Sequence, residues 1–258
     1  MSEERLSLGK RLRQCSSVRC VGVQPNWFDY SQDVRERIVQ SPKVYYPSRL
    51  YEDLFRSLGK IVFPRNYYAF MGHKIRQTSL FQLLNVPHPR TKLYYGTNRM
   101  KKILRDFSFP MIAKKPVGSS QGEGVWLLRS REDLVVYLAD HHPAYIQEYL
   151  PIDRDLRVVL IAQQVVHAYW RLAPSGDFRN NVSRGGTISF ENIPKEALDF
   201  ARWTATVCRF DEVGLDICYA HDRWWVLEAN MVYGLEGFRR RGLDIYGIFR
   251  SLDEGGAL

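Results

Sequence analysis

The sequence lacks any long apolar run. No stretch approaches the roughly 18 apolar residues that a membrane-spanning helix needs, and the N-terminal segment MSEERLSLGKRLRQ has no apolar core typical of a signal peptide. Cysteine is scarce: the residues at positions 15, 20, 208 and 218 form neither a CxxC pair nor a Cys/His cluster that would bind a metal. We therefore expect a cytoplasmic globular protein with free thiols and no membrane partner.

Several familiar catalytic and nucleic-acid-binding signatures are missing as well. The chain has no Gly-Lys-Ser/Thr at the end of a Walker A loop and no HRD or DFG triplet, which argues against a kinase. It shows no zinc finger or RNA-recognition motif, so nucleic acid is an unlikely partner despite the basic charge. The 37 Lys and Arg residues against 28 Asp and Glu give a net charge of +9, which favours an anionic partner such as a nucleotide or an acidic peptide.

The 258 residues are enough for one large or several small packed units. Residues 1–16 are polar and basic, and we expect a frayed tail or a short helix there. Short apolar strands and one helix over about 17–66 predict a small parallel α/β unit, and mostly antiparallel strands follow. The later helices are expected at 72–85, 97–106, 131–138 and 194–209, and the later hairpins pair 156–161 with 165–172 and 213–220 with 224–230.

A glycine-rich loop lies between two apolar strands, Phe109–Lys114 and Val125–Leu128. Glycine lets backbone N–H groups crowd around an anion, and Lys114 adds a positive charge at the end of the first strand. The pattern predicts a flap over a triphosphate, with an ordinary hairpin as the alternative. The candidate phosphate-binding residues of the loop are Gly118, Ser119, Ser120, Gln121, Gly122 and Gly124.

The last hairpin carries two acids and an amide. If a three-residue loop, His221–Arg223, joins its strands, Asp216 lies opposite Glu228, and Asn230 shares the face of Glu228. These oxygen ligands suit Mg²⁺, with Mn²⁺ as an alternative ion, and without a metal the repulsion should raise the pKa of one carboxyl group. A four-residue turn would separate the two carboxylates, and an exposed polar face is the alternative interpretation.

Three more segments place polar groups beside apolar strands. Glu148, Tyr149 and Leu150 end a strand at a position where a hinge backbone could bind adenine. Asp155 could accept hydrogen bonds from a ribose, or it could form a surface ion pair with a neighbouring arginine. Groups that match phosphate and carboxylate oxygens follow at Arg171, Arg179 and Asn181.

Taken in order, these motifs resemble the ATP-grasp superfamily, and specifically its RimK-type branch of ligases that add glutamate to the C-terminus of a ribosomal protein. The resemblance rests on Lys74, Lys114, GSSQGEGV, QEYL, DLR, DFRNN with RGG, GLD and LEANMVYGLEG, over about residues 60–245. It implies an α/β and α+β fold: a small N-terminal pre-ATP-grasp α/β domain followed by two lobes that clamp ATP. The expected boundaries are 1–16 for the tail, 17–70, 71–147 and 148–258.

The resemblance also implies roles for individual residues. It places Lys74 and Lys114 at the ATP phosphates, Glu148 and Leu150 at adenine, Asp155 at the ribose, Asp216, Glu228 and Asn230 at magnesium, and Arg171, Arg179 and Asn181 at the acyl phosphate and the acceptor. One departure affects the acceptor side, because Met231–Tyr233 replaces the small residues and proline that the family usually has there.

We therefore expect an ATP- and Mg²⁺-dependent carboxylate–amine ligase that forms an amide through an acylphosphate. Its substrates would be glutamate or another amino acid together with an acidic peptide or a small acid. A catalytically inactive ATP-binding regulatory module and a basic nucleic-acid-binding protein are the alternatives. The sequence leaves the substrates and the formation of a homo-oligomer open.

Overall fold

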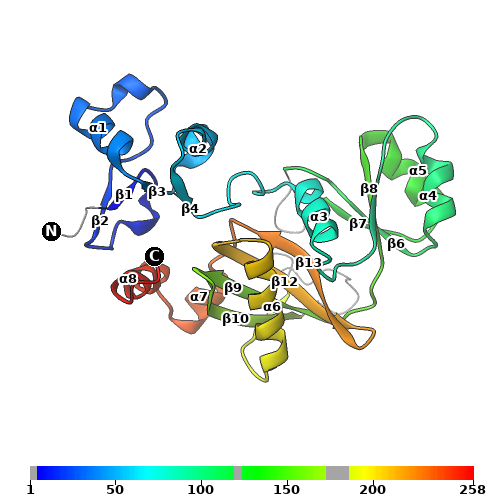
Figure 1. Cartoon of the computed structure of the whole chain (residues 1–258). Helices are drawn as coiled ribbons and strands as arrows, with labels where there is room; N and C mark the ends of the chain where they lie inside the picture. Colours follow the sequence, from blue (N-terminus) through cyan, green and yellow to red (C-terminus); the bar gives the residue numbers. More distant parts are fainter. Residues whose placement is uncertain (1–4, 119–123, 173–185) are drawn as a thin grey trace.

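Three sheets, each with its own helices, make up the computed structural model (Figure 1). It describes residues 5–118, 124–172 and 186–258. The N-terminal sheet has the strand order β2-β1-β3-β4, the central sheet β5-β8-β6-β7, and the C-terminal sheet β11-β10-β9-β12-β13. No helix in the described ranges is long and apolar enough to span a membrane.

The N-terminal unit is a parallel sheet with helices, as the alternation of strand and helix predicts. Its first strand lies inside the sheet, so residues 5–16 do not form a frayed tail, whereas the short helix that was the other expectation is present as a 3₁₀ helix at Lys10–Leu12. The physical reason is a short alternation in which Leu6 and Leu8 are buried between polar neighbours. The elements are β1 (Arg5–Ser7), the 3₁₀ helix η1 (Lys10–Leu12), β2 (Val18–Cys20), the 3₁₀ helix η2 (Trp27–Asp29), α1 (Gln32–Gln40), β3 (Lys43–Tyr45), α2 (Ser48–Ser57) and β4 (Ile61–Phe63).

The central lobe contains the predicted strand–loop–strand flap. Strands β6 and β7 pair antiparallel on either side of the glycine loop, and helices α4 and α5 pack on the sheet around the buried Ile103 and Leu134. Ser130 begins α5 with a reciprocal capping box to Asp133, which satisfies backbone donors at the helix start. The elements are α3 (Lys74–Leu83), β5 (Thr91–Tyr94), α4 (Arg99–Asp106), β6 (Met111–Lys114), β7 (Val125–Leu128), α5 (Arg131–Asp140) and β8 (Ala144–Glu148).

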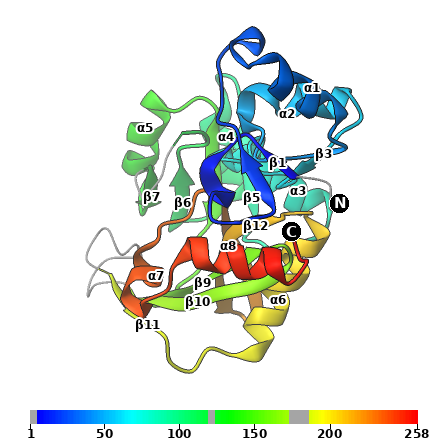
Figure 2. The same cartoon turned by 90° about the vertical axis from the view of Figure 1, so that its left-hand side faces the viewer.

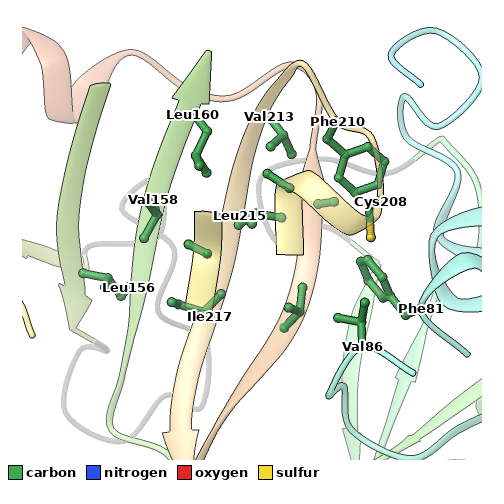
Figure 3. Packing of buried hydrophobic residues seen from close by; sticks show 14 of the residues in the cluster. Phe81, Val86, Leu156, Val158, Leu160, Cys208, Phe210, Val213, Leu215 and Ile217 are labelled. Atoms are coloured by element: carbon green, nitrogen blue, oxygen red, sulfur yellow. The ribbon is translucent and has the colours of Figure 1, made fainter. Parts of the chain in front are cut away.

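The C-terminal lobe is an antiparallel sheet with one long helix on one face. Ala197, Ala201 and Ala205 recur along α6 and are fully buried, so the helix lies close to the strands. Phe81 and Val86, from α3 and the segment after it, pack against the same cluster near Phe210 (Figure 3). The elements are β9 (Arg154–Ile161), β10 (Gln164–Leu172), β11 (Thr187–Ser189), α6 (Lys195–Val207), β12 (Glu212–Ala220), β13 (Arg223–Asn230), α7 (Glu236–Arg241) and α8 (Ile245–Glu254).

The opposite face of the C-terminal sheet has two parts: one packs against the N-terminal unit and α8, and the other is polar. Near Val159 and Ile161 it packs against the N-terminal unit and α8, which lie together in Figure 2. The fully buried Glu212 accepts hydrogen bonds there from Tyr46 Oη at 2.7 Å and Tyr233 Oη at 2.9 Å, and it pairs with Arg11. The remainder of this face is polar and lies toward the central lobe.

The packing under α6 generates a stability prediction. Phe210 is fully buried and contacts Phe70 with the ring centroids 5.6 Å apart. We expect Phe210→Ala to lower the free energy of unfolding by about 3–5 kcal/mol, measured by urea denaturation, because it leaves a cavity. The matched control is Phe28→Ala, since that side chain is 82% exposed. Equal losses in both variants would contradict the assignment of Phe210 to the core.

Candidate functional site

A cavity lies between the central and C-terminal sheets, and its lining is partly apolar and partly charged. The apolar lining is Ile112, Val125, Leu150, Ile152 and Leu227. The charged lining is Lys114, Asp155, Arg171, Asp216 and Glu228, and Glu148 and Tyr149 also border the cavity. The structure therefore brings eight of the predicted site residues to one cavity.

The register of the last hairpin places Asp216 directly opposite Glu228. The expected three-residue loop is wrong: Ala220 pairs with Arg223, so the turn contains only His221 and Asp222, both with positive φ. A β-bulge restores the pairing, because Ile217 pairs with Val226 and the next residue of β13 is extra. The predicted juxtaposition of the two carboxylates is thus confirmed, but for a different reason.

The bulge also sets which face Glu228 occupies. Strand residues alternate between faces, and Val226 packs under α6. A regular strand would turn Glu228 toward that same apolar core. The extra residue, Leu227, brings both itself and Glu228 to the cavity side, where both line the cavity.

Protein cations neutralise both of these carboxylates. Lys74 Nζ lies 2.6 Å from Glu228 Oε1, and Asp216 pairs with Arg157 and Arg171. Burial alone would raise the pKa of Asp216, but the two guanidinium groups outweigh it and hold that pKa below its usual range. The expected rise from carboxylate repulsion is therefore wrong for Asp216, because the arginines remove the repulsion.

The donor set fits magnesium in its chemistry. Asp216 and Glu228 supply carboxylate oxygens, and Asn230 Nδ2 lies 3.1 Å from Asp216 Oδ2. Few oxygen ligands of this kind suit Mg²⁺ that is shared with substrate phosphates. No cluster of three or more His, Cys, Asp or Glu side chains able to hold a metal is found in the described residues, so a metal here would depend on Asn230 and on phosphate oxygens.

Asp155 and Arg171 form a buried pair. Arg171 donates from Nε to Oδ1 at 2.6 Å and from Nη2 to Oδ2 at 2.8 Å. Burial raises the pKa of Asp155, and Arg171 opposes this rise. The alternative of an arginine pair is thus realised, although the pair lies inside the cavity rather than on the surface. The ribose role of Asp155 stays a prediction.

Two lysines lie beside the carboxylates: Lys74 because α3 is attached to both lobes, and Lys114 because it ends β6 at the cavity. Gln77, one turn after Lys74, binds the backbone of Ala229 through its amide oxygen and nitrogen, at 3.2 and 2.6 Å. At the start of α3, the backbone of Lys74 donates to Pro116 at the base of the flap. Lys114 ends β6 and is buried, and this burial lowers its pKa to about 8 although Glu228 opposes the shift.

The flap supplies part of the predicted phosphate site. Gly118 and Gly124 have φ of +71° and +76°, values that residues other than glycine rarely adopt. The remaining predicted residues Ser119, Ser120, Gln121, Gly122, Arg179 and Asn181 lie outside the described residues.

The hinge residues lie at the end of β8, beside the cavity. Glu148 donates its backbone N–H to Arg90 O at 2.9 Å and accepts from Arg90 N through its carboxylate at 2.6 Å. Glu148 is thereby fixed to the segment before β5. Tyr149 and Leu150 follow it in the chain and also line the cavity.

Sequence reasoning included Arg157 in the DLR motif but assigned it no role. It lies two residues after Asp155, and the period-2 alternation of a strand was the signal that could have placed both on one face. The structure puts Arg157 directly opposite Asp216 across β9 and β12, with both side chains 8% exposed. Leu227 was also missed, since nothing in a single sequence marks a bulge.

A family model for the RimK-like ATP-grasp domain matches residues 72–249. The chain belongs to this family. Ribosomal protein bS6–L-glutamate ligase of Escherichia coli is 30% identical over 181 residues, which cover 67% of this chain and 60% of that protein. The corresponding ligase of Salmonella newport matches at 30% identity over 183 residues. The chain therefore spans about three fifths of the length of these curated relatives.

Solved structures confirm the ATP-grasp fold with its N-terminal domain. The ATP-grasp ligase PsnB, complexed with precursor peptide PsnA2 and AMPPNP, matches with a TM-score of 0.67 at 18% identity. The match covers 100% of this chain and 99% of the PsnB chain. D-Alanine–D-alanine ligase from Bacillus anthracis has a TM-score of 0.64 at 12% identity, covering 93% and 86%. At these identities the likeness concerns the fold alone.

Close packing at Gly214 generates a prediction for this RimK-like site. A Cβ there would lie 2.7 Å from Tyr233 Cβ and 3.2 Å from Arg157 Cδ. We expect Gly214→Ala to lower the free energy of unfolding by about 1–3 kcal/mol, because Tyr233 Cβ is attached to the backbone and cannot rotate away. The control is Gly234→Ala, because a Cβ there meets nothing within 4 Å. Its free energy of unfolding should stay unchanged or rise slightly. Thermal or urea unfolding checks both, and an unaffected Gly214→Ala would contradict the packing.

Proposed function

We propose that the protein is an ATP-dependent ligase that joins a carboxylate to an amine through an acylphosphate. The observation that carries the proposal is the single cavity in which an apolar slot adjoins Lys114, Arg171 and the Asp216–Glu228 pair. An apolar slot suits a nucleobase, and cations beside paired carboxylates suit a metal-bound phosphate chain. Membership in the RimK-like ATP-grasp family supports the same interpretation.

The base would lie between Ile112 of the central lobe and Leu227 of the C-terminal lobe, which both belong to the apolar lining of the cavity. The N–H of Glu148 is already donated to Arg90, so it is not the hinge donor. We infer that adenine meets the carbonyl of Glu148 and the N–H of Leu150, with Tyr149 beside them. Asp155 is the candidate for the ribose.

The phosphates would extend toward Lys74, Lys114 and the flap glycines. Asp216, Glu228 and Asn230 would hold magnesium, which when bound neutralises charge that develops on the transferred phosphoryl group. Lys114 keeps its charge below about pH 8 and can stabilise a phosphate oxygen directly. Arg171, held by Asp155, presents a fixed guanidinium to the same cavity.

The chemistry needs no protein nucleophile. A carboxylate oxygen of the substrate attacks the γ-phosphorus of ATP, the bond to the β-phosphate oxygen breaks, and ADP leaves. An amine then attacks the acyl carbon of the acylphosphate, phosphate leaves with the electrons of the C–O bond, and the nitrogen loses a proton. Positioning and charge neutralisation by the lysines and arginines account for catalysis.

The substrate class follows from charge and from the relatives. A net charge of +9 favours an acidic substrate, and relatives carry the name bS6–L-glutamate ligase. We propose that glutamate or another amino acid is joined to an acidic peptide or a small acid, with Arg179 and Asn181 on the acceptor side. The lobes at 71–147 and 148–258 would clamp the nucleotide. The N-terminal domain, expected at 17–70, would begin earlier, at strand β1.

An ATP-binding regulatory module without catalysis is the second candidate. The presence of both lysines together with the complete acid–acid–amide set favours the enzyme, because a module that only binds nucleotide needs fewer of these groups.

The test is incubation with Mg²⁺, ATP and pools of amino acids and acidic peptides, followed by mass spectrometry of new amides and analysis of the nucleotide products. We expect ADP and phosphate with one new amide. AMP and pyrophosphate would contradict the acylphosphate route. Nucleotide binding with no turnover in any pool would favour the regulatory module.

The lowered pKa of Lys114 predicts that nucleotide affinity depends on pH. The ammonium group is charged below about pH 8 and neutral above it, so ADP affinity in the presence of Mg²⁺ should fall by about tenfold between pH 7 and pH 9.5. Lys114→Met should bind ADP weakly at both pH values, with no such slope, because the titrating cation is gone. Calorimetry at the two pH values measures this.

The control is Lys115→Met, which removes the same charge from the exposed neighbouring residue. It should keep the affinity and the slope of the wild type. An equal slope in Lys114→Met and the wild type would rule out Lys114 as the source of the pH dependence.

A further inference from the structure

Three protein donors crowd one oxygen of Asp216, Oδ2, whereas Oδ1 accepts from Arg157 alone among the described residues. Arg157 donates to it through Nε and through Nη2, the latter at 3.0 Å from Oδ2. Arg171 Nη2 and Asn230 Nδ2 reach Oδ2 at 3.0 and 3.1 Å. Each carboxylate oxygen offers about two lone-pair sites. A metal ion can therefore bind Oδ2 of Asp216 only if donors leave this oxygen.

Arg157 is the donor that is least restrained. Arg171 is held in place by its two bonds to Asp155, whereas the hydrogen bonds of the Arg157 side chain within the described residues all go to Asp216. Arg157 is also a full positive charge, so it repels an incoming cation more strongly than the neutral Asn230 does.

Two tyrosines flank the stem of Arg157. Tyr233 covers Gly214, where a Cβ would lie 2.7 Å from Tyr233 Cβ and 3.2 Å from Arg157 Cδ. On the other side, Tyr169 lies directly opposite Arg157 across β9 and β10. A rotation of the guanidinium away from Asp216 would keep it on the cavity side of the sheet.

We propose that Arg157 is a stand-in cation that occupies the metal's position on Asp216 and is displaced when magnesium arrives with the nucleotide. This inference rests on the proposed function of the same site. Arg157 keeps the buried carboxylate neutralised in the metal-free protein, where an unpaired charge would be costly. The negative phosphates of the nucleotide compensate the extra cation, so the metal binds well only together with the nucleotide.

The test uses Mn²⁺ alone as the probe, with free Mn²⁺ measured by electron paramagnetic resonance in the absence of nucleotide. We expect Arg157→Met to bind Mn²⁺ about tenfold more tightly than the wild type, because the competing cation is removed while the stem length is kept. The control is Arg154→Met, which removes the same charge from an exposed position on the same strand and should match the wild type. Equal Mn²⁺ affinity in Arg157→Met and the wild type would overturn the proposal.

A second measurement does not depend on the folding of Arg157→Met. In the wild type, the Arg157 Nε–H signal in ¹⁵N NMR, assigned with Arg157→Lys, should be protected from exchange with water. Saturating Mg²⁺ with ADP should remove this protection, and Mg²⁺ alone should leave it. Unchanged protection while backbone signals show that ADP is bound would overturn the displacement. Failure of Mg²⁺ and ADP to bind any variant by calorimetry would instead reject the proposed function.

Discussion

In strand β13, Leu227 and Glu228 together face a single residue, Asp216, of the neighbouring strand. This bulge is the constraint on which the candidate site depends. It brings Glu228 out of the face that packs under α6, so that both Glu228 and Leu227 line the same cavity. One extra residue thus supplies the cavity with both a carboxylate and an apolar wall for a base.

The C-terminal sheet can contain many buried charges because one of its faces is apolar and the other holds the charged side chains in pairs. The face under α6 is apolar and supplies the packing energy, as the cluster around Leu215 and Phe210 shows (Figure 3). The other face pairs each acid with a cation or a hydroxyl: Glu212 beneath the N-terminal unit, and Asp155 and Asp216 in the cavity. Buried charges without partners would be strongly destabilising, so these pairings stabilise the polar face of the sheet.

Much of the site could be predicted from sequence because its signals are local. Glycines beside a strand-end lysine predict the flap, and strand alternation predicts that Asp216 and Glu228 meet. The two-residue turn and the bulge were not predicted, because they shift the strand register in opposite senses and leave no mark in a single sequence. Strand β1 was not predicted because two alternating leucines are too weak a pattern. The ion pair of Arg157 was not predicted because its partner Asp216 lies 59 positions away in the chain.

The account's central claim is that the Asp216–Glu228 pair binds the metal of a nucleotide whose base lies against Leu227. A crystal structure with Mn²⁺ and AMPPNP tests this most directly, because anomalous diffraction locates the metal independently of the chain. We predict a metal peak within about 2.5 Å of carboxylate oxygens of both Asp216 and Glu228, with the adenine between Ile112 and Leu227. A metal bound away from this pair, or a base outside that slot, would contradict the account.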